Sequence, residues 1–413
     1  MLQSNDDPGA QVRSMDGAMR DSPRAWRVVA AGFIATFTLF GIVYSFGAFF
    51  RPMGVEFGAS RMPTAAVFSI TAGIYNALGA PAGHLSDRYG PRPVLLAAAF
   101  FMGTGLILTS RIDRLWIGYL TYGLGVGLGG ACCYVPMVSV VGGWFARWRN
   151  TALGISVAGI GCGTLAMAPL AAVLIEHYGW RDTYVILGAA SALILVICAL
   201  VVEPPPIHLR AARPRLSAAV RTPNFAMLWA ASLLSSIAIY VPFVYLPEFA
   251  HDQGVSRVAA ATLVGIIGGA SVVGRMVLGV VADRMGIMWL YKLCTLALGL
   301  SYAVWILTSG YGWLVVFALT MGAAYGGMVA LSPAVVAELF GVQGLGAVLG
   351  TLYTSSAISA LVGPPLAGFV IDRSGSYLWA AAFAGCTCVV GFFIIIPLRP
   401  ARPAFAVGLA EAD

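Results

Sequence analysis

Long, nearly uninterrupted apolar runs dominate the hydrophobicity pattern of this chain. An α-helix needs about 20 apolar residues to cross the hydrocarbon core of a bilayer, whereas the strands of a transmembrane barrel are segments of about ten residues that alternate in polarity. The runs therefore predict an all-α membrane protein with twelve transmembrane helices. Their ranges are 25–50, 63–86, 91–110, 114–141, 148–175, 181–202, 223–250, 257–284, 288–309, 311–338, 343–372 and 375–397.

Only one connection between these runs is long, at residues 203–222. It contains the run Pro204-Pro205-Pro206 and four arginines, and it divides the predicted helices into six and six. We therefore expect two six-helix halves with polar tails at both ends. The predicted layout is a tail at 1–24, a first half at 25–202, a linker at 203–222, a second half at 223–397 and a tail at 398–413.

The two halves repeat each other in sequence at a constant offset of 196 residues. One constant offset over such a distance indicates a duplicated six-helix unit. Carriers built from parallel repeats bind the substrate near the middle of the membrane, at the interface of the halves. The halves rock against each other, so that the site opens to one side of the membrane and then to the other. The matching segments are 83–90 with 279–286, 153–154 with 349–350, and 169–171 with 365–367.

Composition narrows the class of protein further. Of the 413 residues, 59% are hydrophobic and 10% are charged, well below the charged fraction of about 25% that is usual for a soluble domain. The seven cysteines lie inside apolar runs and are interpreted as packing residues. Since the chain carries no catalytic triad, metal cluster or nucleotide-binding loop, we expect no enzyme activity, no cofactor, no metal and no drive by ATP.

The formal charge of +7 is explained by topology and needs no nucleic acid. With an even number of spans, the side that holds both termini collects 16 of the 24 basic residues and the opposite side 7. By the positive-inside rule both termini are cytoplasmic. Residues 1–24 lack the apolar core of a signal peptide. We expect an integral protein of the inner or plasma membrane that functions as a monomer.

The remaining basic residue is Arg275, which lies inside the apolar run 257–284. An arginine at the centre of a membrane helix costs about 2.5–3.5 kcal/mol, so its side chain must face the protein interior. The central parts of the other runs contain no Asp or Glu, and the repeat-equivalent position is Gly79. An anionic substrate is therefore the expected partner. The alternative is a structural arginine bound to backbone carbonyls or a neighbouring carboxylate.

Motifs along the chain resemble those of a known family. The pattern Gly83, Asp87, Arg88, Gly90 and Arg92 is a strong signature of the major facilitator superfamily. Within it the chain is similar to monocarboxylate transporters and to bacterial oxalate/formate exchangers. The residues that carry this similarity are Trp144-Phe145, Arg149, Ala152, Gly154, Ala158-Gly159 and Gly163, the glycine-rich run 123–129, and Arg275 followed by 279–283.

The resemblance implies a monocarboxylate site around Arg275, with departures. The transporter pattern would place an aspartate where this chain has Ser271 and a lysine where it has Tyr44. The exchangers would add a lysine within 343–372, a segment without any basic residue. One buried cation matches one carboxylate rather than two.

Other side chains within the spans are candidate substrate ligands. A phenol can donate a hydrogen bond to a carboxylate while its ring walls a pocket, although membrane tyrosines also serve as anchors or packing residues. Serine and asparagine can instead bond structurally between helices. The candidates are Tyr119, Tyr325 and Tyr353, with Asn76, Tyr44, Ser355 and Ser356 as weaker ones.

The charges in the repeated loops predict a cytoplasmic gate whose contacts form in one conformation and break in the other. The alternative is that these charges only enforce topology. The gate residues are Asp87, Arg88, Arg92, Asp283 and Arg284. For the proton, the sequence offers only peripheral groups: Glu248, His251, Asp252 and Glu338.

These features predict a secondary active transporter of small monocarboxylates such as lactate or pyruvate. Proton symport by alternating access is the expected mechanism, with the substrate, protons and the bilayer as partners. Two alternatives remain open: a carboxylate anion exchanger that uses the same site, and a sensor that binds a carboxylate without moving it.

Overall fold

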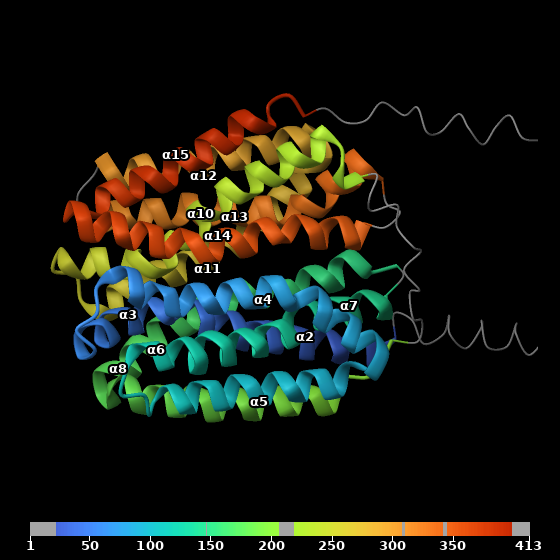
Figure 1. Ribbon diagram of the computed structural model, residues 1–413. Helices are drawn as coiled ribbons and strands as arrows, with labels where there is room; N and C mark the ends of the chain where they lie inside the picture. The colour runs from blue at the N-terminus through green and yellow to red at the C-terminus, as the bar shows by residue number, and fades with distance from the viewer. Residues whose placement is uncertain (1–21, 146, 206–218, 308–309, 342–344, 399–413) are drawn as a thin grey trace, which may run out of the picture. The chain divides into compact units, whose positions relative to one another are not determined.

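The computed structural model describes residues 22–145, 147–205, 219–307, 310–341 and 345–398, apart from the side chains of Asp283 and Leu345. The described part is helical (Figure 1). Its elements are α2 (Pro23–Tyr44), α3 (Phe46–Glu56), α4 (Arg61–Tyr89), α5 (Pro91–Thr109), α6 (Leu115–Gly118), η1 (Tyr119–Val126), α7 (Gly127–Trp144), α8 (Arg149–Val201), α10 (Pro223–Asp252), α11 (Arg257–Met285), α12 (Ile287–Leu307), α13 (Tyr311–Phe340), α14 (Leu345–Ser374) and α15 (Tyr377–Ile395).

The described residues contain 11 helical segments long and apolar enough to cross a membrane. One of them, α8, has 53 residues, which is about 80 Å of helix and more than twice the thickness of a hydrocarbon core. Its helical geometry is interrupted at Gly179, with φ 77° and ψ 165°. Because α8 therefore provides two crossings, the twelve predicted spans are confirmed.

Left-handed glycines mark the duplication in the backbone itself. Three pairs with positive φ lie 196 residues apart, each at a turn between consecutive helices. A side chain would be strained at these φ values, so glycine is retained at both members of a pair. The pairs are Gly58 with Gly254, Gly90 with Gly286, and Gly179 with Gly375. The two pseudo-symmetric halves predicted from sequence are thus confirmed.

The chain divides by its internal contacts into two compact units, and the boundaries between these units fall within two helices, α10 and α11. The first unit comprises residues 1–210 with 243–269, and the second comprises 211–242 with 270–413. In the first unit α8 packs against α2 and α5, and α4 packs against α7. In the second unit α12 packs against α13 and α15 (Figure 1). The last part of α10 and the first part of α11 therefore belong with the first sequence half.

Small residues let the helices approach closely within each unit. A Cβ on Gly159 or Gly163 of α8 would collide with the backbone of Phe33 or Phe37 in α2. The same holds in the second unit for Gly326 of α13, whose Cβ would meet the Ser271 carbonyl of α11. Close packing of this kind supplies van der Waals attraction, which drives helix association in a bilayer.

Candidate functional site

The intramembrane arginine lies against an aromatic ring of the neighbouring helix. In the second unit, Arg275 of α11 has its guanidinium carbon 5.7 Å from the ring centre of Tyr325 of α13. Tyr325 is 7% exposed, and the Nε and Nη2 atoms of Arg275 are shielded from solvent. A cation above an aromatic face is attracted by the ring's quadrupole, and more strongly where water is excluded.

The position of Arg275 follows from the close packing of α11 and α13. Gly274 packs against the backbone of Ala323, and Gly326 against that of Ser271. Gly274 is the sequence neighbour of Arg275, and Gly326 is that of Tyr325, so the two helices pack backbone against backbone at the level of this pair. The structure thus brings together two of the predicted ligands, Arg275 and Tyr325.

A row of hydroxyl groups joins α10 and α14 in the second unit. The Ser355 hydroxyl donates to Ser232 at 3.1 Å and to the Leu352 carbonyl at 2.6 Å. Ser356 shares a hydrogen bond of 3.1 Å with Ser236. These two predicted ligands therefore hold helices together, while Ser356 and its neighbour Tyr353 remain half-buried.

The first unit contains the other three predicted ligands. Tyr44 is 3% exposed and stacks on Phe243, with ring centres 4.0 Å apart and an interplanar angle of 10°. The Tyr119 hydroxyl donates to the Pro63 carbonyl at 3.0 Å, in the first turn of α4. The Asn76 amide donates to the Ala72 carbonyl of the same helix at 2.8 Å. At 1.5 Å per residue, Pro63 and Asn76 are about 20 Å apart along α4, so the Tyr119 hydroxyl and Asn76 lie at different levels of that helix.

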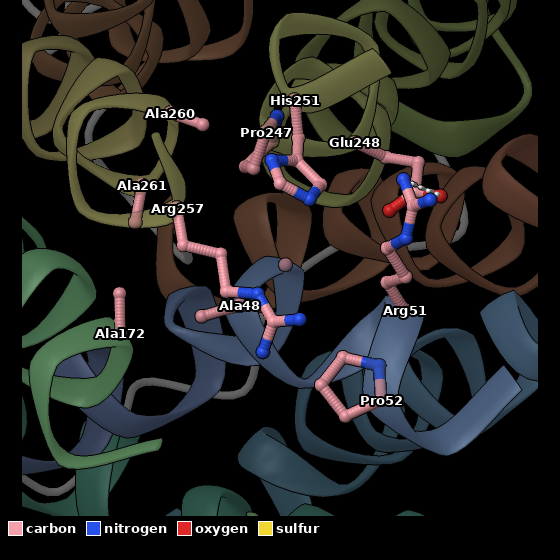
Figure 2. A pocket seen from close by; sticks show the side chains of 11 residues that line it. Ala48, Arg51, Pro52, Ala172, Pro247, Glu248, His251, Arg257, Ala260 and Ala261 are labelled. Atoms are coloured by element: carbon pink, nitrogen blue, oxygen red, sulfur yellow. Dashed lines mark ion pairs between the residues drawn. The ribbon is translucent and has the colours of Figure 1, made fainter. Parts of the chain in front are cut away.

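A cluster of charges lies where α3 ends, α4 begins and α10 ends. Arg51 Nη1 is 2.6 Å from Asp252 Oδ1 and 3.6 Å from Glu248 Oε1. Arg61 Nη2 is 3.9 Å from the other oxygen of Asp252. The Glu248 side chain is 10% exposed, compared with 35% for Asp252. Figure 2 shows the residues that line the adjoining cavity: His251 and Arg257 point toward its middle, and Arg51 points toward Glu248.

With this geometry established, comparison with known proteins assigns the family. Residues 32–312 and 289–412 match the sequence profile of the Major Facilitator Superfamily. The chain belongs to this superfamily.

Relatives within the superfamily resemble the chain over most of its length. Monocarboxylate transporter 12-B of Danio rerio is 30% identical, over 89% of this chain and 86% of the relative. Monocarboxylate transporter 3 of Rattus norvegicus is 32% identical, over 91% of this chain and 80% of the relative.

Solved structures share the fold. The nucleoside transporter NupG superposes with a TM-score of 0.74 at 15% identity, over 90% of this chain and 98% of NupG. A bacterial homologue of the human lysosomal transporter Spinster, in an inward-facing and occupied conformation, superposes with a TM-score of 0.69 at 17% identity, over 91% of this chain and 95% of the homologue. The superfamily fold is therefore present over nearly the whole chain.

The superfamily signature lies at the end of α4 and the start of α5. Asp87 and Arg88 are exposed, and the Arg88 guanidinium lies 5.2 Å from the Tyr89 ring centre. Arg284, at the corresponding place in the second unit, is also exposed. The side chain of Asp283 lies outside the described residues, so the predicted gate contact of that residue is not described.

Arg92, which was predicted as a gate residue, caps a helix. Its Nε donates to the Val202 carbonyl at 2.8 Å, at the end of α8. In the second unit, Lys292 donates to the carbonyls of Ile396 and Leu398, at 2.8 Å each. Val202 and Leu398 are 196 residues apart, so a basic side chain caps the last helix of both halves.

Two features of the site escaped sequence reasoning. The glycine-rich stretch is partly a π-helix, η1, in which Tyr122 is completely buried and donates to the Ile42 carbonyl at 3.5 Å. The run of glycines at 123–129 was the available signal, but it does not specify i→i+5 hydrogen bonding. The charge cluster was also missed as a unit, because Arg51 and Asp252 are 201 residues apart in sequence.

Proposed function

We propose that this protein is a secondary active transporter of small monocarboxylates, of the size of lactate or pyruvate, that works by alternating access. The observation that carries the proposal is Arg275, a cation within a membrane span beside the Tyr325 ring. The relatives named as monocarboxylate transporters support the substrate class.

In this proposal Arg275 binds the carboxylate and Tyr325 walls the pocket. A guanidinium presents two parallel N–H donors that match both oxygens of a carboxylate. Tyr353 and Ser356 of α14 are the next ligands within the second unit, since both are half-buried. Tyr44, Asn76, Tyr119 and Ser355 stay predictions as substrate ligands.

We further propose that both termini are cytoplasmic, because basic residues are concentrated on their side of the membrane. This orientation places the turns at Gly58 and Gly254 at the outer end, and the superfamily signature at the cytoplasmic end. Asp87 and Arg88, with Asp283 and Arg284, are then the cytoplasmic gate that was predicted from sequence. A protein of this topology belongs in the cell membrane.

Proton symport is the coupling that we propose, with anion exchange as the second candidate. Exchange is favoured by one observation: the position one helical turn before Arg275 is Ser271, where the family pattern implies an aspartate. A carrier without that acid must bind its proton elsewhere or exchange one anion for another.

Substitution of the arginine tests the proposal. Arg275→Gln should fold but lose lactate binding, measured by thermal shift in detergent, and lose labelled lactate uptake into proteoliposomes. Arg275→Lys should restore only part of both, because the planar pair of donors is lost. Arg111→Gln removes the same charge from an exposed position and is the matched control. Uptake by Arg275→Gln at the control's rate would reject the proposed site.

A further inference from the structure

The charge cluster of Arg51, Arg61, Glu248 and Asp252 does not follow the duplication of the chain. Glu56 ends α3 and Asp252 ends α10, and the two are 196 residues apart, so they are equivalent in the repeat. Glu56 is bound within its own half: Arg181 donates to it at 2.6 and 3.1 Å, and the Trp180 indole donates at 2.5 Å.

Asp252 has no equivalent arginine in its own half. The position 196 residues after Arg181 is Tyr377. Instead, Asp252 forms ion pairs with Arg51 and Arg61, which belong to the first sequence half. The loss of one symmetric partner therefore turns a bond within a half into a bond between the two sequence halves.

Two other members of the cluster also break the repeat. The equivalent of Arg51 is Pro247, and the equivalent of Glu248 is Pro52. The duplicated architecture therefore required a charge at neither position. Because Arg51 and Glu248 are charged in one half only and yet lie together, we infer that they serve a purpose beyond the shared fold.

Glu248 occupies the most enclosed position of this cluster. Its side chain is 10% exposed, and its distance of 3.6 Å from Arg51 exceeds hydrogen-bond length, whereas Arg51 binds Asp252 at 2.6 Å. Enclosing an ionised carboxylate with an imperfect partner costs free energy that enclosing a neutral carboxyl does not.

Charged or titratable groups surround Glu248 on several helices. Arg51 comes from α3 and Arg61 from α4, while His251 and Asp252 lie on its own helix and Arg257 comes from α11. The remaining wall from α8 is Ala172, which carries no charge (Figure 2). The His251 ring is hydrogen-bonded through Nδ1 to the Val255 carbonyl at 2.9 Å.

We propose that Arg51, Arg61, Glu248 and Asp252 form the outer gate of the transport cycle, and that Glu248 is the group through which external protons favour closure of that gate. The inference rests on the proposed carrier function and orientation. A proton from the outer aqueous phase binds a carboxylate oxygen of Glu248, and the neutral carboxyl enters the closed cluster. Asp252 stays ionised and holds Arg51. When the gate reopens, Glu248 returns the proton to water.

Distance measurement across the cluster tests this without any substrate. Spin labels on Val55, 75% exposed at the end of α3, and on exposed Gln253 report the separation of the two helix ends. Cys132, Cys162 and Cys386, the cysteines that are not buried, are replaced by alanine in this background. Between pH 8 and pH 6 the ratio of short to long distances should rise by up to about tenfold per pH unit, the limit for one linked proton.

Single variants separate the gate from its proton dependence. Glu248→Gln should keep a short-distance population, and its ratio of short to long distances should change less than about twofold between pH 8 and pH 6. One linked proton would change that ratio up to about a hundredfold over the same range. Asp252→Asn should increase the long-distance population at both pH values. His251→Gln, and Glu176→Gln as the matched exposed carboxylate, should respond like the unmodified protein.

Two results would overturn the inference: a Glu248→Gln variant that follows pH like the unmodified protein, or an Asp252→Asn variant with unchanged distances. A protein that shows the expected distances but takes up no monocarboxylate would retain the gate and reject only the proposed substrate.

Discussion

At the scale of single residues, the proposed substrate class depends on one side chain. Arg275 is a cation within a membrane span, and its repeat-equivalent Gly79 shows that the architecture did not require a charge there. Beside it, Tyr325 supplies an aromatic face rather than a second positive charge. In the proposed site, this pair compensates one negative charge.

Substrate charge should therefore discriminate strongly. A second carboxylate in the same pocket would be an anion without a matched cation in low dielectric, at a cost of several kcal/mol. Since about 1.4 kcal/mol is tenfold in affinity, succinate or oxalate should bind at least about a hundredfold more weakly than lactate. Competition against labelled lactate in proteoliposomes measures this ratio.

A new cation provides the converse experiment. Ser356→Lys places a positive charge on α14, at a half-buried hydroxyl that bonds Ser236. It should narrow or reverse the preference for monocarboxylates. Equal competition by oxalate and lactate in the unmodified protein would refute the argument from charge.

At the scale of helices, the last helix of each half is capped by a basic side chain, and the two caps differ in burial and in the number of carbonyls bound. The last turn of a helix has carbonyls without intrahelical partners, and a cation can satisfy them. Lys292 is 9% exposed and serves two carbonyls, whereas Arg92 is exposed and serves one. Burial and the number of acceptors therefore predict unequal contributions to stability.

Lys292→Met should lower stability by about 1–3 kcal/mol, because enclosed carbonyls lose their donor. Arg92→Met should lower it by about 0.3–1 kcal/mol, the usual range for an exposed cation at a helix end. Thermal unfolding in detergent, followed by tryptophan fluorescence, compares them. A larger effect of the Arg92 variant would contradict this assignment of the caps.

The α11–α13 contact offers a second prediction at the same scale. Gly326→Ala adds a Cβ that collides with the Ser271 backbone, so α11 must move and the Arg275–Tyr325 pair must loosen. Lactate affinity should fall about tenfold, equivalent to about 1.4 kcal/mol, and the melting temperature should fall with it.

Gly312 supplies the matched control on the same helix, α13. A Cβ at Gly312 meets no atom within 4 Å. Gly312→Ala should therefore leave lactate affinity unchanged, and it should hold or raise stability because alanine favours helix by about 1 kcal/mol over glycine. If both variants lost lactate affinity equally, the loss would come from alanine anywhere in α13 and not from the contact of Gly326 with Ser271.

At the scale of the whole molecule, the duplication governs the transport proposal. Glycine pairs 196 residues apart place equivalent turns in both halves, yet Arg275, Arg51 and Glu248 have uncharged equivalents. In a duplicated scaffold whose charged positions differ, the proposed substrate site at Arg275 and the proposed outer gate at Arg51 and Glu248 can lie in different places. The proposed proton coupling then depends on which group of this scaffold binds the proton.

An inward proton gradient should drive lactate accumulation in proteoliposomes. The physical reason is that Arg275 favours the anion within the site, so the proton must travel on the substrate or bind elsewhere on the protein. Accumulation should disappear when a protonophore collapses the gradient. Uptake that persists without the gradient, but requires internal carboxylate, would favour the exchanger.

The sequence by itself determined the number of spans, the duplication and the presence of one intramembrane arginine. These are decided locally, because a run of about 20 apolar residues inserts as a helix whatever its neighbours are. A charge within such a run is visible without coordinates, and so is a repeated Gly83–Gly90 motif.

Only the tertiary structure decided which partners the polar side chains take. Arg51 meets Asp252 across 201 residues, Arg92 meets the Val202 carbonyl across 110, and Tyr119 meets that of Pro63. Hydrogen-bond partners depend on which helix faces pack together, and a low-dielectric interior requires every polar group to find one. The pattern along the chain shows which groups need partners, and the packing of distant helices selects them.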